Sequence, residues 1–173
     1  WLVRDLEATT QPWRIAVFHV PGYASGEATS ENNVRFGLQP ILERYGVQLA
    51  LAGHEHNYAR SVPWLTAPGV NTPVVHVVSG GGGASLNTPT VAAWSAASAR
   101  VYHAVSVTAD DCAPAQACTL SLGAFDASGQ VFDTFTLPLR DRNGDASPPS
   151  VSWTAPVPGA RVSGTLDVAV DAV

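Results

Sequence analysis

The pattern of apolar and polar residues predicts two short strands with a helix between them in the first third of the chain. Residues 47–52 form a near-continuous apolar run, which is typical of a strand buried on both faces. Residues 14–19 form a second apolar run, which a Pro-Gly turn follows. Because a helix-length segment separates the two runs, we expect parallel strands whose carboxyl ends lie together.

The segment between these strands carries the start and stop signals of a helix. Ser30 can cap its first turn, and Gly46 supplies a left-handed stop. Apolar side chains recur between them at helical spacing, namely at Val34, Leu38, Ile41, Leu42 and Tyr45. Pro40 removes an amide donor inside this segment, so we expect it either to kink the helix or to end its first part.

Most of the remaining chain alternates with the period of strands. Residues 1–8 have helical spacing instead and are expected to end a helix. The strand-like segments lie at residues 72–79, 101–108, 118–124 and 131–139. Residues 126–129, between the last two, are expected to form a hairpin turn. The whole pattern predicts the α/β (α+β) class, with antiparallel strands in its later part.

Four consecutive glycines, residues 80–83, follow the strand over residues 72–79. A glycine run after a strand invites comparison with a phosphate-binding P-loop, but the Lys-Ser/Thr ending of that motif is missing. We therefore expect these glycines to allow a close approach of the backbone, with no chemical role.

Three histidines follow the two predicted parallel strands at the points where the strands end. His19 ends the first strand, and His54 and His56 follow the second after Gly53. A glycine there permits the sharp turn that brings side chains to the carboxyl edge of a sheet, where open α/β sheets bind ligands. Because neutral imidazole is the commonest metal ligand in proteins, the pattern predicts a metal site formed by these three side chains.

The histidines also have a simpler interpretation. Taken alone, His54 and His56 could be ordinary loop residues. Three imidazoles at one sheet edge are harder to explain by packing, since each would need its own hydrogen-bond partner if buried. His76 and His103 lie within strand-like segments, so we interpret both as structural residues.

Composition narrows the class of protein. Hydrophobic residues make up 46% of the 173 residues, which is enough for a real core. A net charge of −5 argues against binding to a nucleic-acid backbone, because proteins that do so usually present a basic face. No apolar run has the length that a transmembrane segment needs. The low charged fraction of 13% favours an exported protein.

Cys112 and Cys118 are the only cysteines of the chain. They flank a short segment that resembles a hairpin loop, where a disulfide ring can form in an oxidising compartment. Two free thiols are the alternative.

The histidine segments resemble the carboxyl half of a calcineurin-like metallophosphoesterase and are most similar to the purple acid phosphatase branch. His19-Val20-Pro21 corresponds to the His-x-Pro strand end of that family, and Gly53-His54-Glu55-His56 to its Gly-His-x-His motif. Trp1-Leu2, ahead of Pro12-Trp13, is similar to the Trp-Leu helix before the histidine strand. The resemblance extends from residue 1 to about residue 140.

This resemblance implies part of a four-layer α/β/β/α sandwich and the hydrolysis of phosphate esters. The substrate would be a small monoester, a diester or a nucleotide, and the nucleophile a metal-bound hydroxide at a dinuclear centre. The two divalent or trivalent ions would be iron, zinc or manganese. His19 and His54 would bind one ion and His56 the other. Apart from the resemblance, Tyr23 lies in the polar loop after His19 and is a candidate substrate contact by that position, with an ordinary solvated loop residue as the alternative.

The resemblance also shows which family blocks are not in this sequence. The blocks that supply a bridging aspartate, an asparagine ligand and further site residues do not occur here as strand-terminal motifs. We therefore expect a fragment that is inactive alone, with its bridging aspartate and general acid in a missing amino-terminal half.

The end of the chain is expected to leave the catalytic domain, residues 1–140. Residues 141–149 are polar and predict a linker, which we prefer to a calcium loop because the usual terminal Glu is missing. Residues 150–173 alternate like strands and resemble the start of a bacterial immunoglobulin-like repeat. That fold needs about seven strands, so this second β-sandwich domain would be truncated.

Together these features predict a secreted or cell-surface bacterial phosphoesterase. Its immunoglobulin-like domain could contact a cell surface or a polysaccharide. An alternative of a different class is an exported binding or adhesion module whose phosphatase-like domain has degenerated.

Overall fold

The computed structural model describes residues 1–25, 32–66, 72–112 and 118–139. The chain divides into two units, Trp1–Arg140 and Asp141–Val173, and all described residues belong to the first. Ser30, the expected helix cap, lies outside the described residues. So do the expected linker and immunoglobulin-like segment.

The helical elements precede the first two strands of the main sheet. Helix α1 (Leu2–Ala8) comes before β1 (Ile15–Phe18), and a π-helix, η1 (Asn33–Leu38), continues into α2 (Gln39–Arg44) before β2 (Leu49–Ala52). None of the described helices combines the length and apolar character needed to cross a membrane.

Pro40 and Gly46 explain where α2 begins and ends. Pro40 lies in the first turn of α2, where a missing amide donor costs little, and so marks the end of one helical segment and the start of the next. Pro40 was expected either to kink the helix or to end its first part, and the structure shows the second of these outcomes. Gly46 follows with a φ of 70°, and this confirms the left-handed stop.

The main sheet has five strands in the order β1-β2-β4-β3-β5. The last three are β3 (Tyr58–Ser61), β4 (Val75–Ser79) and β5 (Ser95–Ala99). Strands β1 and β2 are parallel, as expected, and β4 is parallel to β2, whereas β3 and β5 are antiparallel to their neighbours. The register pairs Phe18 with Ala52, so the carboxyl ends of β1 and β2 lie side by side.

A second sheet contains β6 (His103–Ala109), β7 (Thr119–Asp126) and β8 (Val131–Pro138), all antiparallel. These strands confirm the three segments predicted from alternation. Cys112 and Cys118, in the connection from β6 to β7, form a disulfide with 5.5 Å between their Cα atoms.

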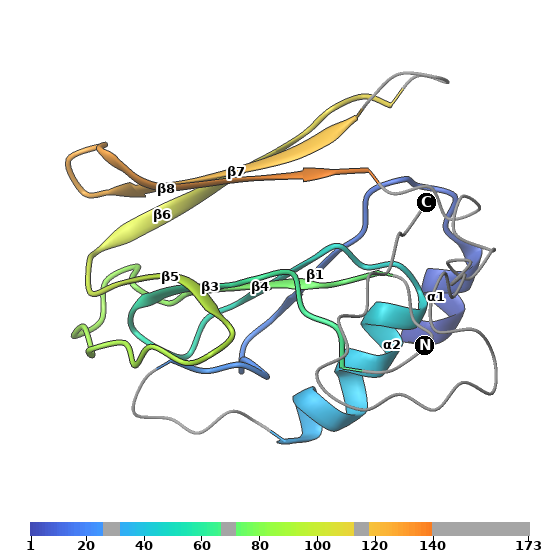
Figure 1. Cartoon of the computed structure of the whole chain (residues 1–173), viewed down its shortest axis with the longest axis horizontal. Coiled ribbons are helices and arrows are strands. Elements are labelled where there is room, and N and C mark those ends of the chain that lie inside the picture. The colour runs from blue at the N-terminus through green and yellow to red at the C-terminus, as the bar shows by residue number, and fades with distance from the viewer. Residues whose placement is uncertain (26–31, 67–71, 113–117, 140–173) are drawn as a thin grey trace, which may run out of the picture. The chain divides into compact units, whose positions relative to one another are not determined.

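The described elements form three layers, with the five-stranded sheet between the helices and the second sheet (Figure 1). One apolar cluster fills the space between the sheets, and another packs the first sheet against the helices. The alternation of β2 explains both clusters, because Leu49 points to the first and Ala50 to the second. The mixed α/β class is confirmed, and three of the four expected layers are described.

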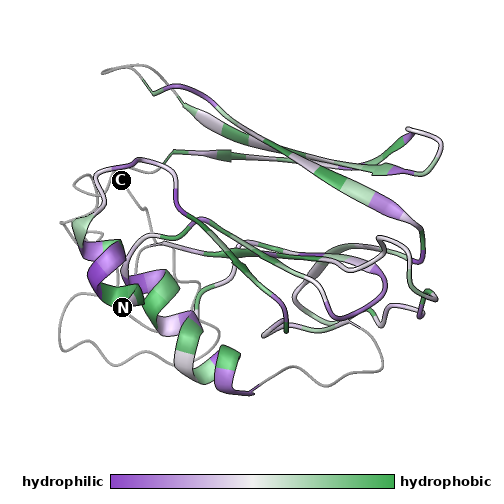
Figure 2. Ribbon diagram, turned by 180° about the vertical axis from the view of Figure 1, so that it is seen from behind, coloured by the Kyte–Doolittle hydropathy of each residue, from purple (hydrophilic) through white to green (hydrophobic). Residues whose placement is uncertain are grey.

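Along the strands of the second sheet, hydrophobic residues (green) alternate with less hydrophobic ones (paler), as expected for a sheet with one face in the core (Figure 2). Strand β1 is an exception on one face, where Ile15 is 40% exposed and Val17 is 76% exposed. Both side chains belong to β1, which is an edge strand of the main sheet.

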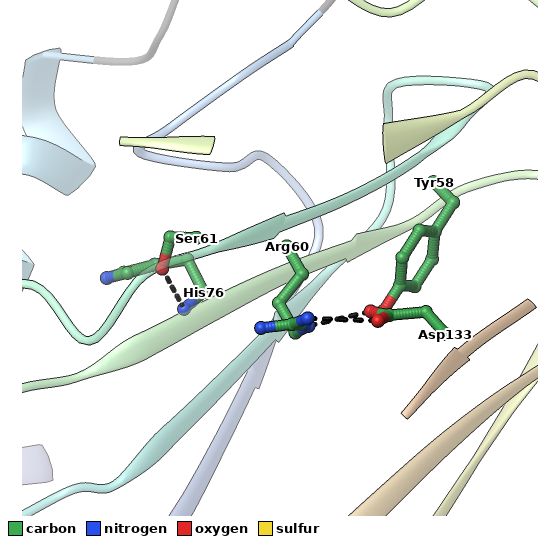
Figure 3. A network of polar contacts seen from close by, with 5 residues as sticks. All are labelled: Tyr58, Arg60, Ser61, His76 and Asp133. Atoms are coloured by element: carbon green, nitrogen blue, oxygen red, sulfur yellow. Dashed lines mark hydrogen bonds and ion pairs between the residues drawn. The ribbon is translucent and has the colours of Figure 1, made fainter. Parts of the chain in front are cut away.

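A buried ion pair joins the two sheets (Figure 3). Arg60 of β3 donates from Nε and Nη2 to the carboxylate of Asp133 on β8, at 2.7 and 2.9 Å. The Tyr58 hydroxyl donates to the same carboxylate at 2.6 Å. The segment that follows the histidine turn is thus tied to the second sheet.

Candidate metal centre

His19 and His54 meet at the carboxyl edge of the main sheet. His54 Nδ1 lies 3.2 Å from His19 Nε2, and the two rings are edge to face with their centroids 5.1 Å apart. Gly53 N also donates to the carbonyl oxygen of His19 at 3.0 Å, because the ends of β1 and β2 are adjacent. The structure therefore brings two of the three predicted metal ligands together.

The backbone of His54 has an unusual conformation. Its φ of 68° lies in the left-handed region, and it is the only non-glycine residue with a positive φ in the described part of the chain. Such a conformation is uncommon for residues with a side chain and is found preferentially at functional sites, where the surrounding structure maintains it. The turn therefore points the His54 ring toward His19 at some cost in backbone energy.

His56 lies near the same place but makes a different contact. Its Nδ1 is 3.0 Å from the carbonyl oxygen of Ser85. A carbonyl oxygen only accepts hydrogen bonds, so Nδ1 carries the proton in this contact and Nε2 keeps its lone pair. His56 and His54 line one pocket of about 590 Å³, together with Asn87 and Arg100.

The three predicted ligands do not form one closed cluster in this structure. Among the described residues, no group of three or more His, Cys, Asp and Glu side chains is arranged to hold a metal ion. The contact of His19 with His54 is direct, whereas His56 shares only the pocket with His54.

The His19–His54 pair nevertheless fits a single bound cation. Nitrogen ligands lie about 2.0–2.1 Å from zinc in tetrahedral sites, which places two of them roughly 3.3 Å apart. The observed separation of 3.2 Å between the ring nitrogens is compatible with that value, and it is also the length of a hydrogen bond between the two rings when one nitrogen carries a proton. Both rings are also exposed at the sheet edge, so an ion can reach them from solvent.

Of the four glycines after β4, Gly80 packs directly against the histidine turn and Gly81 against His103. A Cβ atom at Gly80 would overlap the carbonyl oxygen of Glu55, and one at Gly81 would overlap the ring of His103. The expected close approach therefore holds for Gly80 and Gly81, whereas a Cβ at Gly82 or Gly83 would meet nothing within 4 Å.

His76 and His103 both have structural surroundings, in agreement with the sequence. Burial, with a smaller contribution from the charge of Arg35, lowers the pKa of His76 to about 4. His103 Nδ1 is 2.9 Å from the carbonyl oxygen of Val101, and Nε2 is 3.0 Å from Ser79 Oγ. Neither ring lines the pocket beside His54.

The structure gives no support to substrate contact by Tyr23. The residue is only 3% exposed and does not line the pocket. Its ring packs against His76 at 4.6 Å, against Trp94 at 5.8 Å and against Trp64 at 6.3 Å between centroids. The side chain fills the core beneath its loop because aromatic rings from elsewhere in the chain cover it.

Several residues of the site carry no signal in the sequence that identifies them. Asn87 donates to the carboxylate of Glu55 and accepts from the amide of Asn57, which also donates to the carbonyl oxygen of Ser25. Asn57 stands beside the histidine motif, so proximity could have drawn attention to it. Asn87 lies 31 residues beyond His56, in a segment without a motif.

Comparison with known proteins shows which family a part of this sequence resembles. Residues 1–58 match the family described as calcineurin-like phosphoesterase. Those residues are therefore similar to part of a calcineurin-like phosphoesterase domain, and purple acid phosphatases are among the proteins that the chain resembles in sequence and in structure.

Three individual proteins illustrate the relationship. A probable inactive purple acid phosphatase 24 of Arabidopsis thaliana is 32% identical over 76% of this chain and 24% of its own length. A nucleotide pyrophosphatase/phosphodiesterase of Hordeum vulgare is 32% identical over 73% of this chain and 39% of its own length. The structure of purple acid phosphatase PPD1 from yellow lupin (Lupinus luteus) seeds superimposes with a TM-score of 0.62 and 30% identity, covering 78% of this chain and 27% of the lupin chain. The chain thus spans well under half the length of these relatives.

Proposed function

We propose that this chain supplies the carboxyl-terminal ligands of a dinuclear metal centre that hydrolyses phosphate esters. The observation that carries the proposal is the pair of facing ring nitrogens of His19 and His54, 3.2 Å apart at the carboxyl edge of the sheet. Relatives named as phosphatases and as a pyrophosphatase/phosphodiesterase support the same reaction class.

Each histidine has a proposed role. His19 and His54 would hold one cation, and His56 would offer Nε2 to a second, because Ser85 engages Nδ1. When bound, such cations supply Lewis-acid stabilisation of the phosphoryl group and lower the pKa of a coordinated water. Arg100 places a positive charge on the pocket wall, which favours an anionic ester. A bridging carboxylate and a general acid would come from outside this chain.

Metal binding by the chain itself is the first test. We expect calorimetric titration of the 173-residue chain with Zn²⁺ to show binding that His19→Ala or His54→Ala reduces at least tenfold. Thr88→Ala, on the pocket wall, is the control that should leave binding unchanged. Acid should weaken the binding, since protons compete for the imidazoles.

Hydrolysis is tested with the protein encoded by the complete reading frame. We expect it to contain two metal ions and to cleave p-nitrophenyl phosphate, its bis-ester or both, and the ratio of the two rates assigns monoesterase or diesterase activity. A metal-free protein that cleaves neither ester would refute the proposal.

A second candidate function is an exported binding module with a degenerate phosphatase-like domain. The word "inactive" in the names of two relatives favours it. The two candidates differ in the metal content and activity of the complete protein, so the same assays separate them.

Location and domain organisation form part of the proposal. The Cys112–Cys118 disulfide supports a compartment outside the cytosol, because disulfides persist in oxidising surroundings. We further propose that residues 1–140 belong to the catalytic domain, residues 141–149 to a linker, and residues 150–173 to an immunoglobulin-like domain.

A further inference from the structure

We propose that Asn87 is a positioning residue, which fixes the turn carrying His54 and His56 and sets the tautomer of His56. This inference rests on the proposed function only in treating those two imidazoles as metal ligands. Its test needs neither a substrate nor hydrolysis.

Asn87 contacts each residue of the turn from Glu55 to Asn57. Its Nδ2 donates to Glu55 Oε2 at 3.0 Å, and its Oδ1 accepts from Asn57 Nδ2 at 2.9 Å. Its backbone N donates to the carbonyl oxygen of His56 at 3.1 Å. One residue, distant in sequence, thus holds three consecutive residues of the histidine motif.

The two side chains that Asn87 joins are both buried. Glu55 is 1% exposed and Asn57 is 0% exposed, so bulk water cannot replace Asn87 as a hydrogen-bond partner of these side chains. Leaving a buried polar group without its hydrogen bond costs more than the bond itself contributes. Removal of the Asn87 amide takes one contact from Glu55 and leaves Asn57 Nδ2 with the Ser25 carbonyl oxygen, so the turn should shift.

The segment that carries Asn87 also determines the contact of His56. Ser85, two residues earlier, accepts from His56 Nδ1 through its carbonyl oxygen. Arg100 donates to the carbonyl oxygen of Leu86 at 3.1 Å and so holds the segment from the other side. Displacement of Asn87 should move Ser85 and release His56 Nδ1, and the hydrogen bond at one ring nitrogen decides which tautomer is present.

The chemistry of the asparagine amide suggests a discriminating set of variants. The amide offers one donor group to Glu55 and one acceptor to Asn57. Asn87→Asp keeps the acceptor but places a carboxylate against Glu55. The double variant Asn87→Asp with Glu55→Gln restores the pair with donor and acceptor exchanged, at unchanged total charge. Asn87→Ala removes both groups.

A matched control is available elsewhere in the fold. Gln48 is a buried amide that accepts from Arg14 N at 2.8 Å and donates to the carbonyl oxygen of Pro12 at 2.9 Å. Gln48→Ala therefore removes a comparable pair of hydrogen bonds at a site that does not line the histidine pocket.

Two measurements on the 173-residue chain test the proposal. Competition titration gives the Zn²⁺ affinity, and long-range ¹H–¹⁵N NMR of the metal-free chain reports the tautomer of His56. We expect Asn87→Ala and Asn87→Asp to weaken Zn²⁺ binding at least tenfold, as outer partners of metal ligands typically do. Both should also reduce the Nδ1-protonated form of His56. The double variant should recover both properties, and Gln48→Ala should lower the melting temperature without affecting either.

Several results would overturn the inference. Unchanged affinity and tautomer in Asn87→Asp would do so, as would failure of Glu55→Gln to rescue that variant. An equal loss of affinity in Gln48→Ala would show a general effect of stability. The complete protein could fail to hydrolyse esters while the Asn87 variants changed the Zn²⁺ affinity and the tautomer as expected. That outcome would refute the proposed function and leave the role of Asn87 supported.

Discussion

His54 and Glu55 show how neighbouring side chains can have opposite surroundings at this site. The His54 ring is exposed and faces His19, whereas Glu55 is buried beneath the turn and bonded to Asn87. The positive φ of His54 accompanies this reversal, because it turns one side chain outward and the next one inward. Substitution of the exposed His54 should therefore affect metal binding more than stability, and substitution of the buried Glu55 should affect stability more.

His76 should make the domain sensitive to acid. Its pKa of about 4 in the folded state lies below the ordinary value of 6.5, so the unfolded chain binds the proton first as the pH falls. The contribution of His76 to the free energy of unfolding should be constant above pH 6.5 and decrease from there to pH 4, by about 3 kcal/mol. Urea unfolding at several pH values should show a smaller decrease in His76→Gln. An identical pH dependence in both proteins would contradict this assignment.

Gly80 should tolerate no side chain. A Cβ atom there would overlap the carbonyl oxygen of Glu55, and backbone can yield only by shifting the histidine turn. We expect Gly80→Ala to lower the free energy of unfolding by about 2–3 kcal/mol and to weaken Zn²⁺ binding. Gly82→Ala, with no atom within 4 Å of the new Cβ, is the control and should change stability by less than about 0.5 kcal/mol.

At the scale of elements, the helical segment before β2 combines two kinds of helix. The π-helix η1 ends at Leu38 and α2 begins at Gln39, with Pro40 in its first turn, and Gly46 then reverses the chain toward the following strand. The packing of this segment positions β2, because Leu42 of α2 and Ala50 of β2 belong to one apolar cluster.

Two glycines of this helical region should respond oppositely to the same substitution. Gly37 lies within η1, where a new Cβ would meet nothing within 4 Å, so Gly37→Ala should stabilise the fold by about 0.5–1 kcal/mol. Gly46 has a positive φ and would bring a Cβ to 3.1 Å from Arg14 Nη1, so Gly46→Ala should destabilise by at least about 1 kcal/mol. Thermal unfolding of both variants measures the signs, and equal signs would be inconsistent with these backbone conformations.

At the scale of the whole described unit, two sheets enclose the main core. Leu49 and Val77 of the first sheet meet Leu120 and Leu122 of the second. Within this apolar interface, Asp133 is one polar link between the sheets, and it is bound by Arg60 and Tyr58 (Figure 3). Burial opposes its ionisation, but these hydrogen bonds and the charge of Arg60 outweigh it, so the pKa of Asp133 lies below its ordinary value.

Asp133→Asn should loosen the attachment of the second sheet. The Arg60 and Asp133 side chains are only 12% and 11% exposed, so the substitution leaves a largely buried guanidinium without its carboxylate. We expect a loss of about 2–3 kcal/mol in urea unfolding at neutral pH. The loss should shrink as the pH falls through the folded pKa of Asp133, where wild type loses the same interaction. Asp111→Asn removes an exposed carboxylate and should have little effect.

Prediction from the sequence succeeded where residues close in the chain carried the signal. The apolar run at Leu49–Ala52 predicted β2, and Gly46 predicted the end of the helix before it. By contrast, β5 consists of serine and alanine alone, so no alternation of apolar and polar residues indicated it. Strand β3 was also missed, because its four residues follow the histidine turn without a separate apolar pattern.

The sequence by itself determined the α/β class, the strand ends that carry His19 and His54, and the need for glycine after β4. These depend on local spacing and on backbone freedom, which neighbouring residues specify. Only the tertiary structure decided that Tyr23 turns into the core, that β3 and β5 complete the sheet, and that Asn87 holds the histidine turn. Those outcomes depend on contacts between distant segments, whose geometry follows from how the layers pack together.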